Sequence, residues 1–131
     1  MPVKNILIVD RDLGFVLWLG HILNTRGTTA LPATNVADAA ELVSLLNLRV
    51  DVLIASPGEQ GFREFAAKLR ARSPELQVVG LSSEEHPAWI DAFPDAVWRD
   101  KPRCGDEATG LEWVTLVDEL AHHHLSLAYH S

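Results

Sequence analysis

Short, continuous aliphatic runs alternate along this chain with segments whose apolar residues recur every three or four positions. Runs such as 5–9 (NILIV) and 50–55 (VDVLIA) are typical of strands buried on both faces of a parallel sheet. Neighbouring parallel strands are joined by crossover helices that pack outside the sheet. The alternation therefore predicts an α/β fold, a doubly wound five-stranded parallel sheet with five helices.

The elements are expected at regular positions. Strands are expected at 5–9, 28–31, 50–55, 76–81 and 95–98, with Pro32 ending the second. Helices are expected at 13–25, 35–46, 62–71 and 87–93, and a last one after Gly110. The apolar side of the second helix comprises Ala39, Ala40, Leu42, Val43, Leu45 and Leu46, and that of the last Leu111, Val114, Val117, Leu120 and Ala121. In such sheets ligands bind beyond the carboxyl ends of the strands, so the loops after those ends are where function is expected.

Composition limits what this domain can do. The 131 residues are 47% hydrophobic and 22% charged, enough for one core and too apolar for disorder. We expect a single domain over 1–131, with its core at 4–125 and a frayed tail at 126–131. The formal net charge of −7 repels nucleic acid and anionic membranes, which leaves a protein as the expected partner.

Cysteine usage and the first apolar run indicate the compartment. Cys104 is the single cysteine, so no intramolecular disulfide forms, and no Cys/His set has zinc spacing. The apolar run at 6–9 is interrupted by Asp10, Arg11 and Asp12, which makes it too short for a signal peptide or a membrane span. A cytoplasmic location is the expectation.

The strand ends carry Asp10-Arg11-Asp12, Ser56-Pro57-Gly58, Ser82-Ser83 and Lys101-Pro102. With these loops, 4–10 (KNILIVD), 51–55 (DVLIA), 78–82 (VVGLS) and 100–102 (DKP) resemble, in the right order, the strands of a response-regulator receiver domain. The resemblance covers roughly residues 4–125 and implies the flavodoxin-like fold of CheY-like receivers.

Such receivers accept a phosphoryl group on an aspartate after strand three, and an acidic pair after strand one holds Mg²⁺. By the resemblance, Asp10 is the first member of that pair, whereas Arg11 replaces the second and Ser56 replaces the acceptor. Ser82 and Lys101 match the hydroxyl and lysine positions of the family. The loops at 56–61 and 82–101 look shorter than is usual.

These replacements change the chemistry. A carboxylate is ionised at neutral pH, whereas Ser56 needs a base, and His86, the nearest histidine to the strand ends, precedes a predicted helix. Asp10, Arg11, Ser56 and Lys101 sum to +1, against −2 for three carboxylates and a lysine. Adding nearby Asp12 brings the sum to zero. A pocket without net negative charge does not suit Mg²⁺, so we expect no metal, no cofactor and a degenerate phosphorylation site.

Several residues keep two interpretations. Asp10 is a relic metal ligand or, as favoured here, a structural acceptor that pairs with Lys101 and nearby backbone amides. Asp12 is favoured as a helix N-cap. Arg11 points either into the pocket or to solvent, and the serines take their meaning from the resemblance. In the family, a Lys-Pro step such as Lys101-Pro102 is associated with a cis peptide bond.

Large aromatic residues gather late in the chain. Trp98 lies near the position where receivers carry an aromatic that moves on activation, and it is equally compatible with core packing. Trp89, Phe93 and Trp113, together with Trp98, are either core residues or anchors of an interface formed by the helix at 87–93, the strand at 95–98 and the last helix. His122–His124 are consecutive, so they point in different directions and do not chelate one metal.

The leading hypothesis is a pseudo-receiver, a signalling module that is not an enzyme, is not phosphorylated at the usual site, and acts by docking to a protein or by forming a homodimer. No output domain fits after residue 125. One alternative is residual Mg²⁺-dependent phosphotransfer through Asp10 or Asp12. A small flavodoxin-like cofactor binder is less favoured, because the loop after the first strand has only Gly14 towards a phosphate cradle.

Overall fold

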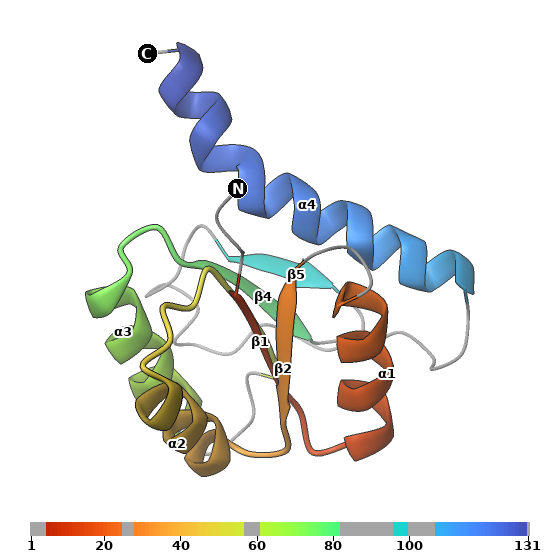
Figure 1. The fold of residues 1–131 in the computed structure, drawn as a ribbon, viewed down its shortest axis with the longest axis vertical. Helices are drawn as coiled ribbons and strands as arrows, with labels where there is room; N and C mark the ends of the chain where they lie inside the picture. The colour runs from red at the N-terminus through yellow and green to blue at the C-terminus, as the bar shows by residue number, and fades with distance from the viewer. Residues whose placement is uncertain (1–4, 25–27, 57–60, 82–95, 100–106, 131) are drawn as a thin grey trace.

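The computed structural model has a parallel sheet with helices packed on both faces (Figure 1). It describes residues 5–24, 28–56, 61–81, 96–99 and 107–130, with the side chains of the last segment described for 109–120. The strands are β1 (Asn5–Val9), β2 (Thr29–Ala33), β3 (Val52–Ala55), β4 (Gln77–Leu81) and β5 (Val97–Arg99). The helices are α1 (Leu13–Asn24), α2 (Val36–Leu46), α3 (Phe62–Arg72) and α4 (Glu107–His130).

The strand order is β2-β1-β3-β4-β5, with every neighbouring pair parallel. The predicted α/β class and the doubly wound five-stranded sheet are confirmed. Because β1 pairs with β2 on one side and β3 on the other, the chain reverses its winding direction at β1. The expected helix at 87–93 lies outside the described residues.

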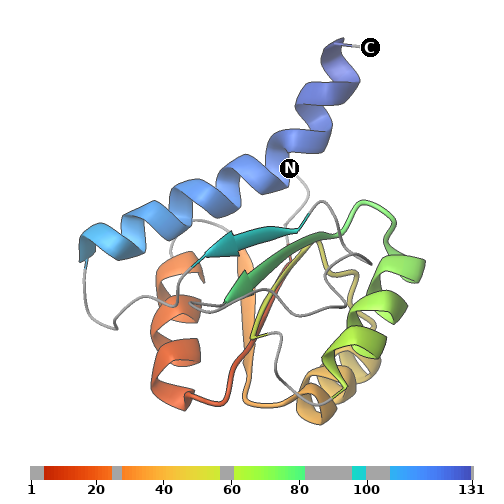
Figure 2. The ribbon, with the colours of Figure 1, turned by 180° about the vertical axis from the view of Figure 1, so that it is seen from behind.

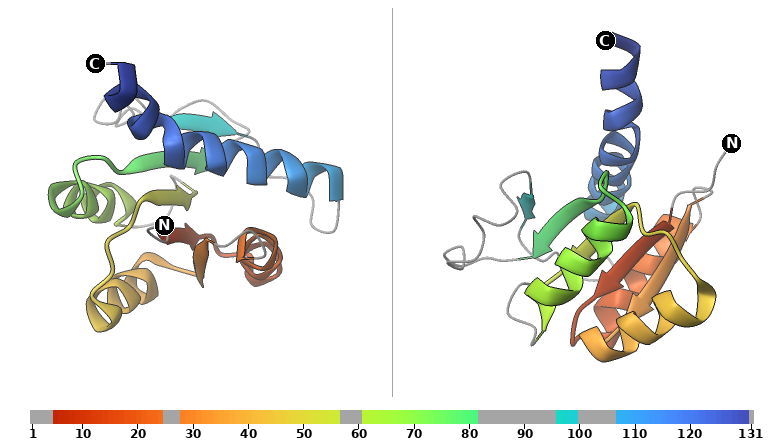
Figure 3. Two further views of the ribbon diagram at one scale, coloured as in Figure 1. Left: turned by 45° about the horizontal axis from the view of Figure 1, so that its top comes forward. Right: turned by 90° about the vertical axis from the view of Figure 1, so that its left-hand side faces the viewer.

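Alternate residues of each strand feed two separate cores. Leu7, Leu53 and Val78 belong to the core under α2 and α3, whereas Ile8 and Ile54 belong to the core under α1 and α4. Figure 3 shows the two pairs of helices on opposite sides of the sheet. Burial on both faces explains why these strands read as continuous apolar runs.

The helix starts follow from local side chains. Asp12 Oδ1 accepts a hydrogen bond from the backbone N–H of Phe15 at 3.1 Å, which confirms Asp12 as an N-cap. Asn35 Oδ1 accepts from the N–H of Asp38 at 2.7 Å and caps α2 in the same way. At the far end of α2, Asn47 adopts a left-handed conformation with φ of 49°, which ends the helix.

Pro32 does not end the second strand as predicted, because it lies within β2, opposite Ile8 of β1. The reason is the place of β2 in the sheet. β2 is an edge strand, and only one of its sides needs ladder donors, so a residue without an N–H is tolerated there.

The predicted apolar sides of two helices are only partly buried. In α2, Ala39 and Val43 are buried, but Leu45 is 73% exposed and Leu46 is 55% exposed. In α4, Leu111 is 54% exposed. The sheet covers only part of each apolar side, and the remaining leucines face outwards.

The helix α4 is longer than the sequence pattern indicates. It starts at Glu107 and continues to His130, so residues 126–130 of the expected frayed tail are helical, and the end of the helix projects beyond the sheet (Figures 1 and 2). His122–His124 lie within this helix. No described helix combines the length and hydrophobicity needed to cross a bilayer.

Candidate functional site at the ends of β1 and β3

The site expected at the carboxyl ends of the strands begins at β1 and β3, which are neighbours in the sheet. Asp10 follows Val9, and Ser56 follows Ala55. The N–H of Asp10 donates to the carbonyl of Ala33 at 3.1 Å, and the N–H of Ser56 donates to the carbonyl of Val9 at 3.3 Å. The sheet therefore extends one residue beyond the assigned strands and holds both backbones in place.

Asp10 and Ser56 contact one another directly. The Ser56 hydroxyl donates to Asp10 Oδ2 at 2.5 Å, and the N–H of Asp12 donates to Asp10 Oδ1 at 2.8 Å. Asp10 is 3% exposed, so this carboxylate is shielded from water while both its oxygens accept hydrogen bonds. Short hydrogen bonds to a charged acceptor are stronger than neutral ones, which gives Asp10 the structural role favoured by the sequence.

The partner that the sequence assigned to Asp10 was Lys101, which lies outside the described residues. The described partner is Ser56, and sequence analysis did not propose this contact. Its signal was available, because Asp10 and Ser56 directly follow strands that the resemblance places side by side. The pairing of Asp10 with Lys101 stays a prediction.

The sequence left open whether Arg11 points into the pocket or to solvent. The structure places this residue on the exposed surface of the turn between β1 and α1. A charge at the solvent-exposed rim is screened by water far more than a buried one. Arg11 therefore contributes less to the charge acting on Asp10 than the formal sum assumes. Position 11 still lacks the carboxylate that forms the second member of the acidic pair in the family.

A Mg²⁺ ion, which the fold implies, does not fit the described residues. Mg²⁺ prefers near-octahedral oxygen ligation with one or two carboxylates facing the ion. Both oxygens of Asp10 accept hydrogen bonds, and one oxygen of Asp12 caps α1. Among the described residues, no group of three or more His, Cys, Asp or Glu side chains is arranged to hold a metal ion.

At the other end of the sheet, Trp98 of β5 lies against β4. An added Cβ on Gly80 would be 2.5 Å from both Cε3 and Cζ3 of Trp98, so the indole lies directly on the glycine backbone. Trp98 is half-buried, which agrees equally with core packing and with an aromatic that moves on activation. Only glycine at position 80 allows this packing.

Of the two interpretations left open for Trp113, core residue and interface anchor, its burial favours the core residue. It is 5% exposed and packs in the core under α1 and α4, together with Phe15 and Val117. Its place on α4 turns it towards the sheet, which makes it a core residue. Ser82, Trp89, Phe93 and Pro102 lie outside the described residues, so the roles expected for them are untested.

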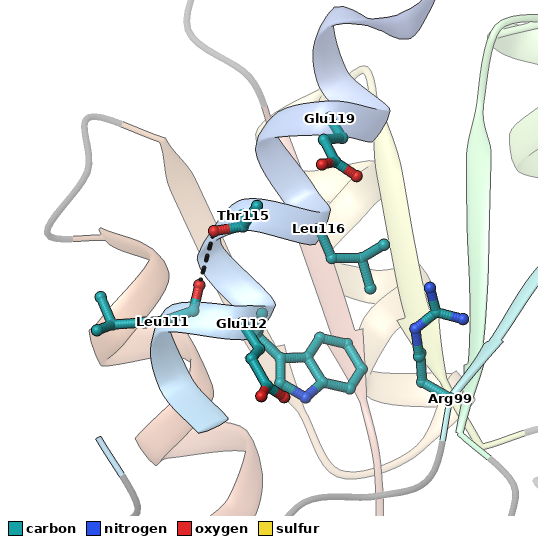
Figure 4. A pocket seen from close by; sticks show the side chains of 7 residues that line it. Arg99, Leu111, Glu112, Thr115, Leu116 and Glu119 are labelled. Atoms are coloured by element: carbon teal, nitrogen blue, oxygen red, sulfur yellow. Dashed lines mark hydrogen bonds between the residues drawn. The ribbon is translucent and has the colours of Figure 1, made fainter. Parts of the chain in front are cut away.

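A hollow of about 440 Å³ lies between β5 and α4 (Figure 4), and Trp113 is one of the residues that line it. Its charged side chains are of both signs, with Arg99 from β5 and Glu112 and Glu119 from α4. Leu111 and Leu116 supply apolar surface. The hollow therefore combines apolar area with opposite charges on one face, defined here as the β5–α4 face.

Several solved structures with a similar fold are receiver domains. The signal receiver domain of an HD domain-containing protein from Pseudomonas fluorescens Pf-5 has a TM-score of 0.72 and 18% identity, covering 98% of this chain and 94% of that one. A response regulator receiver domain protein from Clostridium thermocellum has a TM-score of 0.70 and 12% identity, covering 95% and 99%. A receiver protein from Sinorhizobium medicae WSM419 has a TM-score of 0.69 and 19% identity, covering 92% and 95%.

These likenesses establish the class of the fold. The chain has the CheY-like receiver fold over nearly its whole length, as the resemblance implied. No protein-family model matches the sequence, and a sequence search of curated proteins gives no match either.

Proposed function

We propose that this protein is a pseudo-receiver, a signalling module that works through protein contacts and is not an enzyme. The observation that carries the proposal is the hydrogen bond from the Ser56 hydroxyl to the buried Asp10 carboxylate. In the receiver fold, this pair occupies the position where an acceptor aspartate and a metal-binding aspartate face each other.

The Ser56–Asp10 contact removes the need for a cation. Two carboxylates at this distance repel each other, and in a shielded site such a pair is stable only with a metal ion, a bound proton or a cationic neighbour. A serine hydroxyl satisfies the same carboxylate by donating a proton to it. Ser56 thus supplies by hydrogen bonding what a second carboxylate would need a cation for, and a metal entering the site would compete with Ser56 and the N–H of Asp12 for the oxygens of Asp10.

The same contact disfavours phosphorylation. The Ser56 oxygen is a neutral hydroxyl, and becoming a nucleophile requires transfer of its proton to Asp10. That transfer would leave a protonated carboxyl beside an alkoxide, and an alkoxide is far more basic than a carboxylate. The ground state with the proton on Ser56 therefore dominates, and the site acts as a fixed contact.

We further propose that the β5–α4 face is where a protein partner or a second copy binds. Leu111 is exposed on this face, and Arg99 lies across the hollow from the two glutamates of α4 (Figure 4). A surface that carries both signs of charge is suited to a two-fold interface, because each copy offers the group that the other needs. Light scattering tests this arrangement by measuring the molar mass of the wild-type protein and of Arg99→Glu. If the wild-type protein is a monomer at all concentrations, the partner is a different protein.

The proposal is tested by incubating the protein with acetyl phosphate and Mg²⁺ and measuring its intact mass. We expect no phosphoryl adduct, and a stoichiometric adduct would overturn the proposal. The chemistry of an adduct identifies its position, because an acyl phosphate on Asp10 or Asp12 is cleaved by hydroxylamine and a phosphoserine is not. A hydroxylamine-sensitive adduct would favour residual phosphotransfer.

A second measurement uses tryptophan emission during titration with Mg²⁺ and beryllofluoride. Trp98 is the expected reporter, since its indole is half-buried against Gly80. We expect flat titrations for the wild-type protein. A saturable change that disappears in Trp98→Phe would show that the site still switches.

A further inference from the structure

A second hollow lies at the opposite edge of the sheet from the β5–α4 face. It has a volume of about 410 Å³ and opens between the start of α1, the end of β2 and α2. Leu13 and Val16 line it from α1, Pro32 from β2, and Leu42 and Leu45 from α2. Since β2 and β5 are the two edge strands, this hollow and the β5–α4 face are separate surfaces.

Two exposed leucines line this second hollow, and two more lie next to them along α1 and α2. Leu13 is 56% exposed and Leu45 is 73% exposed, and both line it. Leu17, one helical turn after Leu13, is 52% exposed, and Leu46 beside Leu45 is 55% exposed. A concave surface bordered by several exposed leucines is typical of a protein interaction site.

The charged side chains that line the hollow are both acidic. Apart from His21, the acidic and basic side chains of α1 and α2 are Asp38 and Glu41, and both line the hollow. A second copy would bring the same two carboxylates to the contact, and an anionic membrane would meet them with its own charge. The complementary occupant is apolar and cationic.

We propose that this α1–α2 hollow binds a basic amphipathic segment of a partner protein. Such a segment would be a short helix with leucine-sized anchors at a spacing of three or four residues, flanked by lysine or arginine. The anchors fill the space between Leu13 and Leu45, and the basic side chains face Asp38 and Glu41. This docking surface does not depend on the function proposed for the Ser56–Asp10 contact.

The test measures binding of two labelled synthetic helices of about four turns by fluorescence anisotropy. One helix carries leucines on one face and lysines on the other, and the second replaces every lysine with glutamate. We expect the lysine helix alone to bind. The variant Leu13→Ser/Leu45→Ser should weaken binding at least about tenfold, because each leucine contributes apolar burial, whereas Leu111→Ser should change it less than about twofold.

Two matched charge variants distinguish specific binding at the α1–α2 hollow from attraction by the net charge of the protein. Asp38→Asn/Glu41→Gln and Glu112→Gln/Glu119→Gln each remove two negative charges, the first pair at the α1–α2 hollow and the second at the β5–α4 face. We expect only Asp38→Asn/Glu41→Gln to weaken binding of the lysine helix. In that variant the remaining binding should also depend less on salt concentration. Circular dichroism confirms that each variant is folded.

Three outcomes would overturn the proposal. Equal losses for both charge variants would show that the lysine helix binds by net charge alone. Equal binding of the glutamate helix would remove the role of Asp38 and Glu41. Self-association of the wild-type protein that is lost in Leu13→Ser/Leu45→Ser would assign the hollow to a second copy.

Discussion

Two contacts, one at β1 and β3 and the other at β4 and β5, hold their parts of the sheet together in different ways. At β1 and β3, Asp10 and Ser56 are joined by a hydrogen bond in a shielded place. At β4 and β5, Trp98 is held by shape, because its indole rests where Gly80 has no side chain. The Ser56–Asp10 contact depends on a charged acceptor and a hydroxyl donor. The Trp98–Gly80 contact depends on the lack of a Cβ atom at Gly80. Variants at each end should therefore fail for different reasons.

The largest effect is expected from Ser56→Asp, which places two carboxylates at the end of β1 and β3. With Asp10 almost fully buried, the repulsion should lower the free energy of unfolding by about 3–5 kcal/mol, measured by urea denaturation. We expect Mg²⁺ not to restore this loss while Arg11 remains, and to restore it in Ser56→Asp/Arg11→Asp.

Ser56→Asn is the control for that prediction, since it has nearly the same shape without the charge and should cost much less. Tight Mg²⁺ binding by Ser56→Asp alone would contradict the prediction and show that Arg11 does not oppose the metal.

Ser56→Ala should lower the free energy of unfolding by about 1.5–3 kcal/mol, because it removes a donor to a charged, buried acceptor. The matched control is Ser73→Ala. Ser73 is 2% exposed, and its hydroxyl has no hydrogen-bond partner in the part of the chain that the structure describes. Its removal should cost little or stabilise the protein, and equal losses at both positions would contradict the role given to Ser56.

At the other end, Gly80→Ala should displace the Trp98 indole and cost about 1–3 kcal/mol, because the new Cβ would overlap the ring. The tryptophan emission should move to longer wavelength as the ring becomes more exposed. Gly20→Ala is the control, since its Cβ would meet only Ile8 Cδ1 at 3.9 Å and alanine favours the helix. An unchanged emission spectrum in Gly80→Ala would show that Trp98 adapts without moving.

The smallest effect concerns Asp12, which links the site to α1. Asp12→Ala should cost about 1 kcal/mol through loss of the cap, and Asp12→Asn should retain most of the stability. Asn35→Ala at the start of α2 should cost a similar amount. If the alternative role of Asp12 in binding Mg²⁺ were correct, Asp12→Asn would also abolish a measurable Mg²⁺ affinity.

The hollows at the two edges of the sheet extend the comparison to the surface. They are similar in volume, but the one on the β5–α4 face carries both signs of charge and the α1–α2 hollow carries only acidic groups. The first suits a symmetric contact, and the second suits a basic partner. One small domain of this kind offers two docking surfaces with different preferences.

Much of the fold could be predicted because its signals are local. The run at 5–9 matches β1 at both ends, and the helix expected at 62–71 matches α3 to within one residue. The buried residues of α3 are Phe62, Phe65, Ala66 and Leu69, which recur every three or four positions. The caps at Asp12 and Asn35 depend on side chains within three residues. The resemblance to receivers then places Asp10 and Ser56 at neighbouring strand ends.

Other features depend on what surrounds each residue, and the sequence pattern does not contain that information. Leu45 and Trp113 both fit an apolar helix face, but one is exposed and the other is covered by the sheet and α1. Pro32 fits a strand only because β2 lies at an edge.

The order of strands and helices was thus determined by the sequence alone, because periodicity and capping act over a few neighbouring residues. The tertiary structure alone decided that Asp10 is satisfied by Ser56, which lies 46 positions away. A hydrogen bond of this kind depends on two backbones being held side by side, and only the assembled sheet does that. The same holds for the α1–α2 hollow, whose leucines come together only when α1 and α2 pack on opposite faces of the sheet's edge.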